Sequence, residues 1–362
     1  MIPRWALRLV AMVAMVAFGL GVYHYLGLTK SKINKTASKP TSTKSTFALA
    51  GTLFLAQGGG LYSLHDGSFT ELGRPADWIQ PSLTPDGNLI AVKKEFNYSD
   101  LYELDAKGNV VRQLTHNQSP YEGSDVGYDY WSYYPVVAPD GTLFMSDDRA
   151  KSIYDYAVDF AVWSFPMATP TAVRQWTTPN VETGGDVQPN PTKSGGLLYT
   201  KYDLDADNKN VSSIMLAASP EAAGKALTDP EQDCSQPALS PDQSRLAMIC
   251  ANGQQTQLVL STINGAAIGT SQVLISGTLA ASPTWAPDGS GLVYLAPADQ
   301  TGHFQLWWQS LVAVTPSPTE KALATTPGGS SAPSSPPSYP APKQVTHDLD
   351  FDATSRPAWS PT

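Results

Sequence analysis

Apolar and polar positions alternate in short runs through most of the chain, and the runs are separated by Pro, Gly, Asp and Ser. Residues 89–92, 143–145 and 197–199 are short apolar runs, and residues 100–104 alternate apolar with polar side chains. Alternation with a period of two is typical of β-strands, and no helical period is visible beyond residue 47. The pattern predicts an all-β fold.

One hairpin recurs along the chain. Residues 283–294 read Pro-Thr-Trp-Ala-Pro-Asp-Gly-Ser-Gly-Leu-Val-Tyr, which predicts a strand, a tight turn and a second strand. In Ala-Pro-Asp-Gly, Pro takes the second and Gly the fourth position of a type I turn, where each is favoured. Complete or degraded copies of this segment begin at Pro81, Pro135, Pro189, Pro237, Pro283 and Pro357.

Each repeat also supplies two further strands. After the hairpin comes an alternating segment, and then one that ends in a basic residue, a spacer, an apolar residue and Thr. The second type occurs at residues 112–115, 174–177, 225–228 and 343–346. Four strands in each of six periods predict a six-bladed β-propeller with four-stranded blades, because a single blade cannot bury both of its faces alone.

The two ends of the chain complement each other. The last copy stops after one strand and half a turn, at Ser360-Pro361-Thr362. Residues 51–55 match residues 141–145, which follow the same half-turn in the second copy. The N-terminal strand and the C-terminal strand are therefore expected to share one blade, which closes the ring and removes its open edges.

The last period is longer than the others because of residues 315–342, which are rich in Pro, Ser, Thr and Ala. Closely spaced prolines exclude regular strand pairing. We expect a disordered insertion between the outer two strands of the closing blade. The propeller as a whole is expected to span residues 47–362.

An apolar segment stands at the N-terminus. Residues 9–28 carry no formal charge if His24 is neutral, and they are long enough to cross a bilayer as a helix. A cleavable signal peptide is the alternative, but the segment ends in bulky residues instead of a small-x-small site. We expect residues 1–28 to be an uncleaved signal anchor, and the polar residues 29–46 to be a flexible Lys/Ser/Thr linker.

Basic residues on the two sides of this segment do not decide its orientation. Two arginines precede it and five lysines follow it, so the positive-inside rule is ambiguous. The short N-terminus and a candidate disulfide favour a propeller outside the cytoplasm. The prediction is a single-pass protein of the cell membrane.

Charge and cysteine content narrow the function. The net charge of −9 argues against nucleic acid as a partner, because phosphate binding needs a basic surface. The two cysteines, Cys234 and Cys250, flank one repeat hairpin. If Ser240 pairs with Arg245, they lie on neighbouring rungs, and either a disulfide or two buried thiols would fit.

The hairpin repeat and the Lys/Arg-x-apolar-Thr segments resemble those of the TolB-like six-bladed β-propellers. Related propellers form the N-terminal regions of prolyl oligopeptidases and dipeptidyl peptidases. The resemblance covers residues 47–362 and implies protein or ligand binding outside the cytoplasm. This sequence differs from TolB in its membrane anchor and in lacking a recognisable N-terminal α/β domain. It also lacks the Gly-x-Ser-x-Gly motif of the peptidases.

The loop at residues 116–134 is the most unusual segment, since aromatic and acidic side chains interleave along it. Exposed aromatics beside carboxylates suit stacking on sugars or contact with a cationic peptide. Alternatively, the aromatic side chains simply cover the blade. The candidate ligand-binding residues are Tyr121, Glu122, Asp125, Tyr128, Asp129, Tyr130, Trp131 and Tyr133.

A weak calcium motif lies at Asp203, Asp205 and Asp207. Its sixth position is Asn208 instead of Gly, and its twelfth is Ile214 instead of Glu, so an ordinary turn is the alternative. The acids at Asp348, Asp350 and Asp352 are expected at one mouth of the channel.

These features favour a non-enzymatic module that binds a protein, peptide or glycan, with no catalytic residue and no cofactor beyond a weak calcium site. The alternative is a propeller hydrolase or lactonase that uses channel carboxylates and a bound cation.

Overall fold

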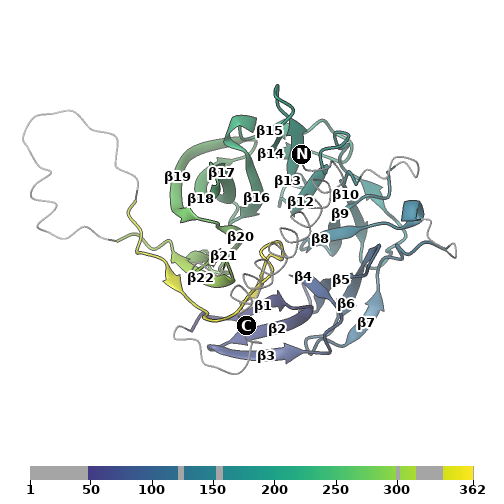
Figure 1. The fold of residues 1–362 in the computed structure, drawn as a ribbon, viewed down its shortest axis with the longest axis horizontal. Helices are drawn as coiled ribbons and strands as arrows, with labels where there is room; N and C mark the ends of the chain where they lie inside the picture. Colours follow the sequence, from purple (N-terminus) through teal and green to yellow (C-terminus); the bar gives the residue numbers. More distant parts are fainter. Residues whose placement is uncertain (1–47, 121–125, 152–157, 299–301, 315–336, 362) are drawn as a thin grey trace, which may run out of the picture.

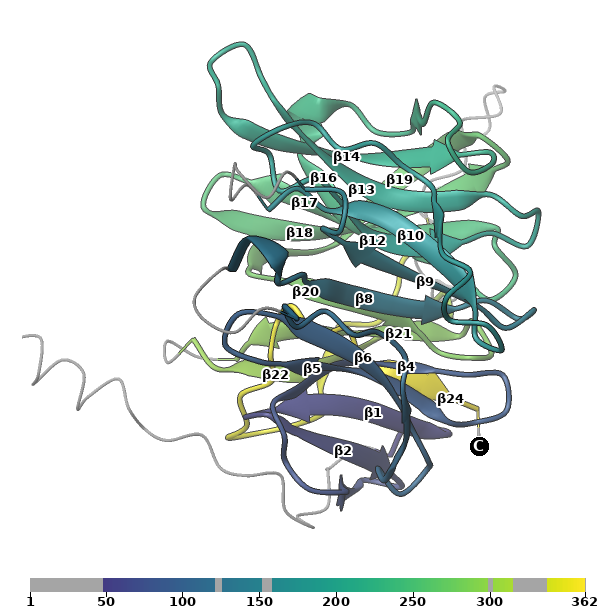
Figure 2. The same cartoon turned by 90° about the vertical axis from the view of Figure 1, so that its right-hand side faces the viewer.

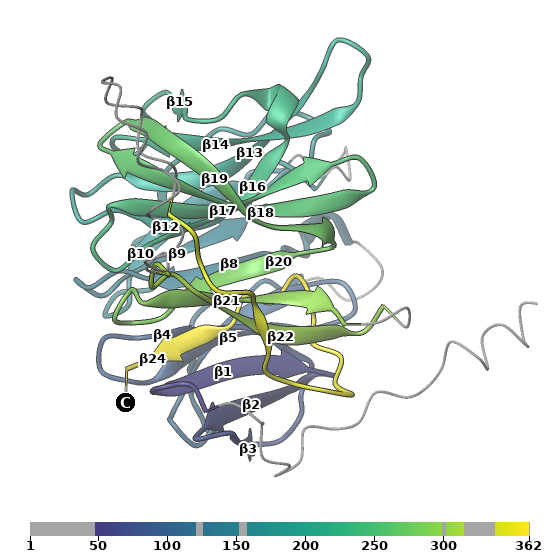
Figure 3. The same cartoon turned by 90° about the vertical axis from the view of Figure 1, so that its left-hand side faces the viewer.

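The computed structural model describes residues 48–120, 126–151, 158–298, 302–314 and 337–361. Within them, 24 strands form six four-stranded antiparallel sheets, arranged as blades around a central axis (Figure 1). The side views show the sheets stacked face to face around the ring (Figures 2 and 3). The prediction of a six-bladed, all-β propeller is confirmed.

Every blade is ordered from an inner strand at the axis to an outer strand at the rim. The inner strands are β4 (Trp78–Leu83), β8 (Ser132–Val137), β12 (Asp186–Pro191), β16 (Cys234–Leu239), β20 (Ala281–Trp285) and β24 (Ala358–Ser360). The second strands are β5 (Leu89–Lys94), β9 (Thr142–Asp147), β13 (Leu197–Leu204), β17 (Arg245–Asn252), β21 (Gly291–Pro297) and β1 (Thr52–Gln57).

The third strands are β6 (Ser99–Leu104), β10 (Ala161–Pro166), β14 (Asn210–Ala217), β18 (Gln255–Asn264), β22 (Phe304–Ser310) and β2 (Gly60–His65). The outer strands are β7 (Val110–Gln113), β11 (Arg174–Gln175), β15 (Lys225–Ala226), β19 (Ala267–Thr278), β23 (Lys343–Gln344) and β3 (Ser68–Leu72). Two short 3₁₀ turns, η1 (Val126–Tyr128) and η2 (Pro230–Gln232), precede β8 and β16.

The repeated turn has the predicted geometry. The backbone N–H of Gly289 donates to the carbonyl of Ala286 at 2.9 Å, and the four other complete copies make the same bond. The fourth turn position has a positive φ in every copy, including Gln243 at 62°. Pro, Asp and Gly therefore serve the architecture of the hairpin.

The ring closes where the sequence predicts. β24 pairs antiparallel with β1, with Leu53 opposite Trp359 and Phe54 opposite Ala358. Gly51 completes the half-turn left by the C-terminus, at a φ of 86°. A Cβ at Gly51 would lie 2.2 Å from the carbonyl oxygen of Ser360, so this junction requires glycine.

The insertion belongs to a different blade from the one expected. Residues 315–342 fall between β22 and β23, the outer strands of the blade β20–β23, which precedes the closing blade. The long period begins at Pro283, and Pro283 lies in β20, the inner strand of the blade before the closing one. Residues 315–336 lie outside the described part of the chain.

The hydrophobic core lies between neighbouring blades. One cluster joins Ile90 and Val92 of β5 to Leu143 and Met145 of β9. The Thr that recurs at the end of the outer segment links the fourth strand to the third, since the Thr115 Oγ accepts the backbone N–H of Leu101 at 2.9 Å. The same hydrogen bond forms in three other blades, from the backbone N–H groups of Val162, Ile214 and Leu306 to the hydroxyls of Thr177, Thr228 and Thr346.

Cys234 and Cys250 form a disulfide. They lie directly opposite each other in the pairing of β16 with β17, and not on neighbouring rungs as expected. The register shifts between Ser235 and Ala238, because a bulge at Gln236 and Pro237 adds one residue to β16. The bulge is what aligns the two cysteines.

The predicted anchor (residues 1–28) and linker (residues 29–46) lie outside the described residues. Within the part of the chain that the structure describes, no helix is long and apolar enough to cross a membrane.

Candidate functional site

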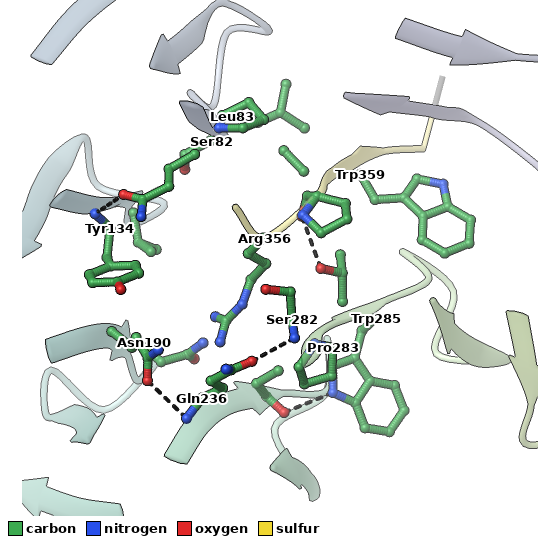
Figure 4. A pocket seen from close by; sticks show the side chains of 18 of the residues that line it. Ser82, Leu83, Tyr134, Asn190, Gln236, Ser282, Pro283, Trp285, Arg356 and Trp359 are labelled. Carbon is green, nitrogen blue, oxygen red and sulfur yellow. Dashed lines mark hydrogen bonds between the residues drawn. The ribbon is translucent and has the colours of Figure 1, made fainter. Parts of the chain in front are cut away.

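The residue before each repeat proline lies on the inner wall of the propeller. In five blades it stands in a bulge of the inner strand with a positive φ. These residues are Gln80 (52°), Tyr134 (54°), Gln188 (58°), Gln236 (56°) and Ser282 (51°). Arg356 has the corresponding position before β24. All six line one cavity at the axis, and Tyr134, Gln236, Ser282 and Arg356 can be followed there in Figure 4.

These residues surround an axial cavity of about 350 Å³ to which all six inner segments contribute. The wall is mainly apolar, with a proline from every repeat together with Leu83, Val136, Leu239, Trp285 and Trp359. The cavity extends from the pre-proline residues to Pro241 and Pro287 in the repeat turns. Its polar groups are amides, hydroxyls and one guanidinium, and no Asp or Glu stands among the described lining residues.

Hydrogen bonds link the pre-proline residues from blade to blade. Each bulge takes a backbone N–H out of the strand ladder, and at four of the five bulges a side chain of the preceding blade accepts it. Gln80 Oε1 accepts from Tyr134 N at 2.6 Å, Gln188 Oε1 from Gln236 N at 2.9 Å, and Gln236 Oε1 from Ser282 N at 2.5 Å. In the closing blade, Ser355 Oγ accepts from Gln80 N at 2.6 Å. We call these bonds the pre-proline belt.

Arg356 is the one charged side chain among the described residues that line the cavity. Its Nη2 donates to the carbonyl of Pro237 across the channel at 2.9 Å. No carboxylate within the described ranges forms an ion pair with it. Burial removes water from the guanidinium and lowers the pKa of Arg356 to about 10, so it remains a cation at neutral pH.

Tyr134 is the titratable neighbour of this cation. Burial raises the pKa of Tyr134 to about 12, and the nearby Arg356 opposes that rise. The phenol is therefore neutral at physiological pH and leaves the charge of Arg356 unbalanced.

The predicted Tyr-rich site is built differently. Tyr121, Glu122 and Asp125 lie outside the described residues. Asp129 is buried, and its carboxylate accepts the backbone N–H of Ser119 at 2.6 Å. Tyr128 is half-buried.

Three further aromatics of this stretch contact neighbouring side chains. Lys151 Nζ lies 5.1 Å from the ring centre of Tyr130 and pairs with Asp148 at 2.9 Å. Trp131 stacks on Tyr133 with ring centres 5.8 Å apart, and Tyr133 also packs on the core. Tyr133 thus covers the blade, and it remains partly open to solvent, as do Tyr128, Tyr130 and Trp131.

Two TolB proteins are among the solved structures to which this chain is similar. TolB from Acinetobacter baumannii superposes with a TM-score of 0.59 and 17% identity, over 85% of this chain and 66% of that one. A candidate TolB from Agrobacterium tumefaciens superposes with a TM-score of 0.52 and 14% sequence identity, over 73% of this chain and 86% of that one. The fold is that of a TolB-like propeller. At these identities the likeness establishes the fold alone.

This TolB-like propeller spans just under two thirds of the Acinetobacter protein. No protein-family model matches its sequence, and no curated protein matches it either. Residue roles therefore have to come from the structure itself.

The acids singled out in the sequence do not converge. In the turn between β13 and β14, the Asp205 carboxylate accepts the backbone N–H groups of Asp207 and Lys209 at 2.9 Å, and Asp203 accepts that of Leu204. The side chain of Asp352 likewise caps Thr354. Among the residues that the structure describes, no group of three or more His, Cys, Asp or Glu is placed to hold a metal ion.

The cavity residues were not among the sequence candidates. Tyr134 stood next to the predicted set, and the other five were overlooked. A signal was present, since the position before each repeat proline is polar in all six copies (Gln, Tyr, Gln, Gln, Ser and Arg). Polar residues at one fixed position of an inner strand mark the surface that faces the axis.

Proposed function

We propose that this TolB-like propeller is a membrane-anchored binding module outside the cytoplasm, and that it holds a peptide segment of a partner protein in its axial cavity. The TolB-like fold is consistent with a protein-binding role. The apolar residues 9–28 support the membrane anchoring in this proposal, and the disulfide, a bond that forms in oxidising compartments, supports the orientation.

The composition of the cavity carries this proposal. Ligand sites are concave, mostly apolar and furnished with a few fixed polar groups. The axial cavity combines proline and tryptophan walls with Asn190, Thr284 and Arg356. Its wall is preorganised by the pre-proline belt, so a ligand does not have to order it on binding.

The partly exposed side chains Tyr128, Tyr130 and Trp131 supply a second candidate surface for a protein or glycan. It lies where the chain enters β8, away from the repeat turns that border the cavity. The alternative of a hydrolase or lactonase would need channel carboxylates, and the described lining carries amides, hydroxyls and a guanidinium instead.

Photocrosslinking on the full-length chain tests where the partner binds. A photoreactive phenylalanine at Leu83 in the cavity should capture a partner protein from the cell envelope. A bulky Asn190→Trp substitution, which fills the cavity, should abolish that crosslink. The matched control is Asn252→Trp at the exposed end of β17, which should leave it unchanged.

The loop surface is tested in the same assay by replacing Tyr128, Tyr130 and Trp131 with Ala. Loss of capture only in this triple variant would move the site to the loop. Equal capture by the wild type and the Asn190→Trp variant would refute the cavity as the binding site.

A further inference from the structure

We infer that the axial cavity recognises the C-terminal carboxylate of a peptide, and that Arg356 is the residue that binds it. This inference rests on the proposed function and gives the ligand of that site a chemical identity.

The first argument is the isolation of the charge. Arg356 is partly buried and its guanidinium has lost hydration, and a cation in that state normally has a carboxylate partner, because an unpaired charge is costly to remove from water. Arg356 has none within the described ranges, and its lowered pKa reflects the same loss of hydration. Of the other lining residues only Tyr134 titrates, and it is neutral. An anionic ligand would supply the missing charge in a protein whose net charge is −9.

The second argument is the presentation of the guanidinium. Figure 4 shows Arg356 reaching into the cavity from the segment before β24. One bond from Nη2 to the Pro237 carbonyl holds it at 2.9 Å. A guanidinium has five N–H donors in a planar fork, so donors remain for both oxygens of a carboxylate. The anchor is fixed, and its remaining donors face the cavity.

The third argument is the shape and chemistry of the wall above Arg356. A chain terminus presents a planar carboxylate for the guanidinium fork together with a last side chain that the apolar wall can contact. Leu83, Val136 and Trp285 offer apolar contact to the last side chains. Asn190 Nδ2 donates to the Pro237 carbonyl at 3.3 Å and Thr284 Oγ1 to the Pro357 carbonyl at 2.9 Å, so the oxygen atoms of both side chains are offered to backbone N–H groups of the entering peptide. A peptide terminus uses all of these groups at once.

Calorimetric titration of the full-length chain in detergent tests the inference. The probes are the tripeptide acetyl-Ala-Pro-Leu with a free carboxylate, the same peptide as its C-terminal amide, and N-acetyl-leucine. The acid should bind the wild type at least about tenfold more tightly than the amide, because a charge-assisted hydrogen bond is lost with the amide. N-acetyl-leucine should bind more weakly than the tripeptide acid.

Arg356→Gln should remove the preference for the acid, and Arg356→Lys should keep part of it, since Lys retains the charge without the fork. Lys107→Gln is the matched control, because it removes one positive charge from an exposed turn outside the cavity. Circular dichroism and thermal unfolding establish that each variant is folded. The Lys107→Gln variant should bind the acid as the wild type does.

Equal affinity of acid and amide, a preference that survives Arg356→Gln in folded protein, or binding of neither peptide would overturn the inference. N-acetyl-leucine binding as tightly as the tripeptide would show that the ligand is a small carboxylic acid and not a peptide terminus. The crosslinking experiment above reports independently on the cavity, so capture at Leu83 without a carboxylate preference would refute only the role of Arg356.

Discussion

The pre-proline residues combine two unfavourable local features. A residue before proline prefers extended backbone, and a residue other than glycine rarely adopts positive φ. Five residues of this chain precede a proline and nevertheless adopt a positive φ, between 51° and 58°: Gln80, Tyr134, Gln188, Gln236 and Ser282. Residues in such conformations persist only when their surroundings enforce them. Here the belt of inter-blade hydrogen bonds provides that enforcement, and the same geometry turns the side chains toward the axis.

The belt should contribute measurably to stability. In a Gln236→Ala variant the N–H of Ser282, which Gln236 Oε1 accepts at 2.5 Å, loses its partner. An unsatisfied buried donor costs about 1–3 kcal/mol, so the free energy of unfolding in urea should fall by that amount. The control is Gln254→Ala, at an exposed turn, which should change the free energy of unfolding by less than about 0.5 kcal/mol. A similar loss in both variants would mean that the belt does not stabilise the ring.

Asp186 gives the fold a pH dependence. Its carboxyl is fully buried at the start of β12, with Lys201 Nζ 3.1 Å from Oδ1, and Oδ2 has no hydrogen-bond partner among the residues that the structure describes. Burial raises the pKa of Asp186 to about 6. Since the folded-state pKa lies above the ordinary value of 3.8, protonation favours the folded state. This stabilisation is complete below about pH 4 and is lost as the pH rises through about 6.

The unfolding free energy of the wild type, relative to that of Asp186→Asn, should therefore fall between pH 4 and pH 6. The limit set by the pKa difference is about 3 kcal/mol. Urea unfolding at pH 4, 5, 6 and 7 measures this difference in unfolding free energy. Burial also raises the pKa values of Asp100 and Asp148, but their contributions cancel because both proteins contain these two residues. Parallel curves for the two proteins would contradict the assignment.

The hairpin of β16 and β17 has a covalent link that the other blades lack within the described residues. Cys234 and Cys250 are 16 positions apart in the sequence, so the disulfide should stabilise the chain by about 3 kcal/mol, mainly by restricting the unfolded state. A Cys234→Ala/Cys250→Ala double variant should lose that stability in urea. The reduced wild type should lose a similar amount, and the double variant should be insensitive to reductant. A reductant-insensitive wild type would show that the bond does not contribute.

How far the sequence predicts the structure differs between elements. The repeated hairpin predicted the blade count and the pairing of β24 with β1, because Pro-Asp-Gly turns are set by local backbone preferences. The alignment of Cys234 with Cys250 was missed by one residue, since a bulge adds residues to a strand without changing its apolar pattern. The cavity was missed for a related reason. Arg356 and Gln236 look like ordinary polar positions until six inner strands are brought round one axis.

The ring has two dissimilar ends. Each inner strand begins at a connection between blades and finishes at a repeat turn, so all the connections gather at one end and all the Pro-Asp-Gly turns at the other. The cavity reaches the turn end through Pro241 and Pro287. The aromatic residues Tyr128, Tyr130 and Trp131 precede β8 and lie at the connection end. A partner in the cavity and a partner on the aromatic loop would therefore approach the molecule from opposite sides.

The orientation of the whole molecule in the membrane gives the last prediction. With residues 9–28 as an uncleaved anchor and the disulfide formed in an oxidising compartment, everything beyond residue 46 should lie outside the cytoplasm. Alkaline phosphatase fused after Thr362 should be active in bacterial cells, because the reporter itself needs disulfides to fold. The same fusion without residues 1–28 should be inactive.

A fluorescent protein fused after Thr362 provides the reciprocal control, because it folds in the cytoplasm. This fusion should fluoresce only when residues 1–28 are removed. The full-length chain should also migrate faster on gels without reductant, through the bond between Cys234 and Cys250. A full-length phosphatase fusion that is inactive although it is expressed as strongly as the full-length fluorescent-protein fusion would place the propeller in the cytoplasm. The partner of the axial cavity would then have to be sought inside the cell.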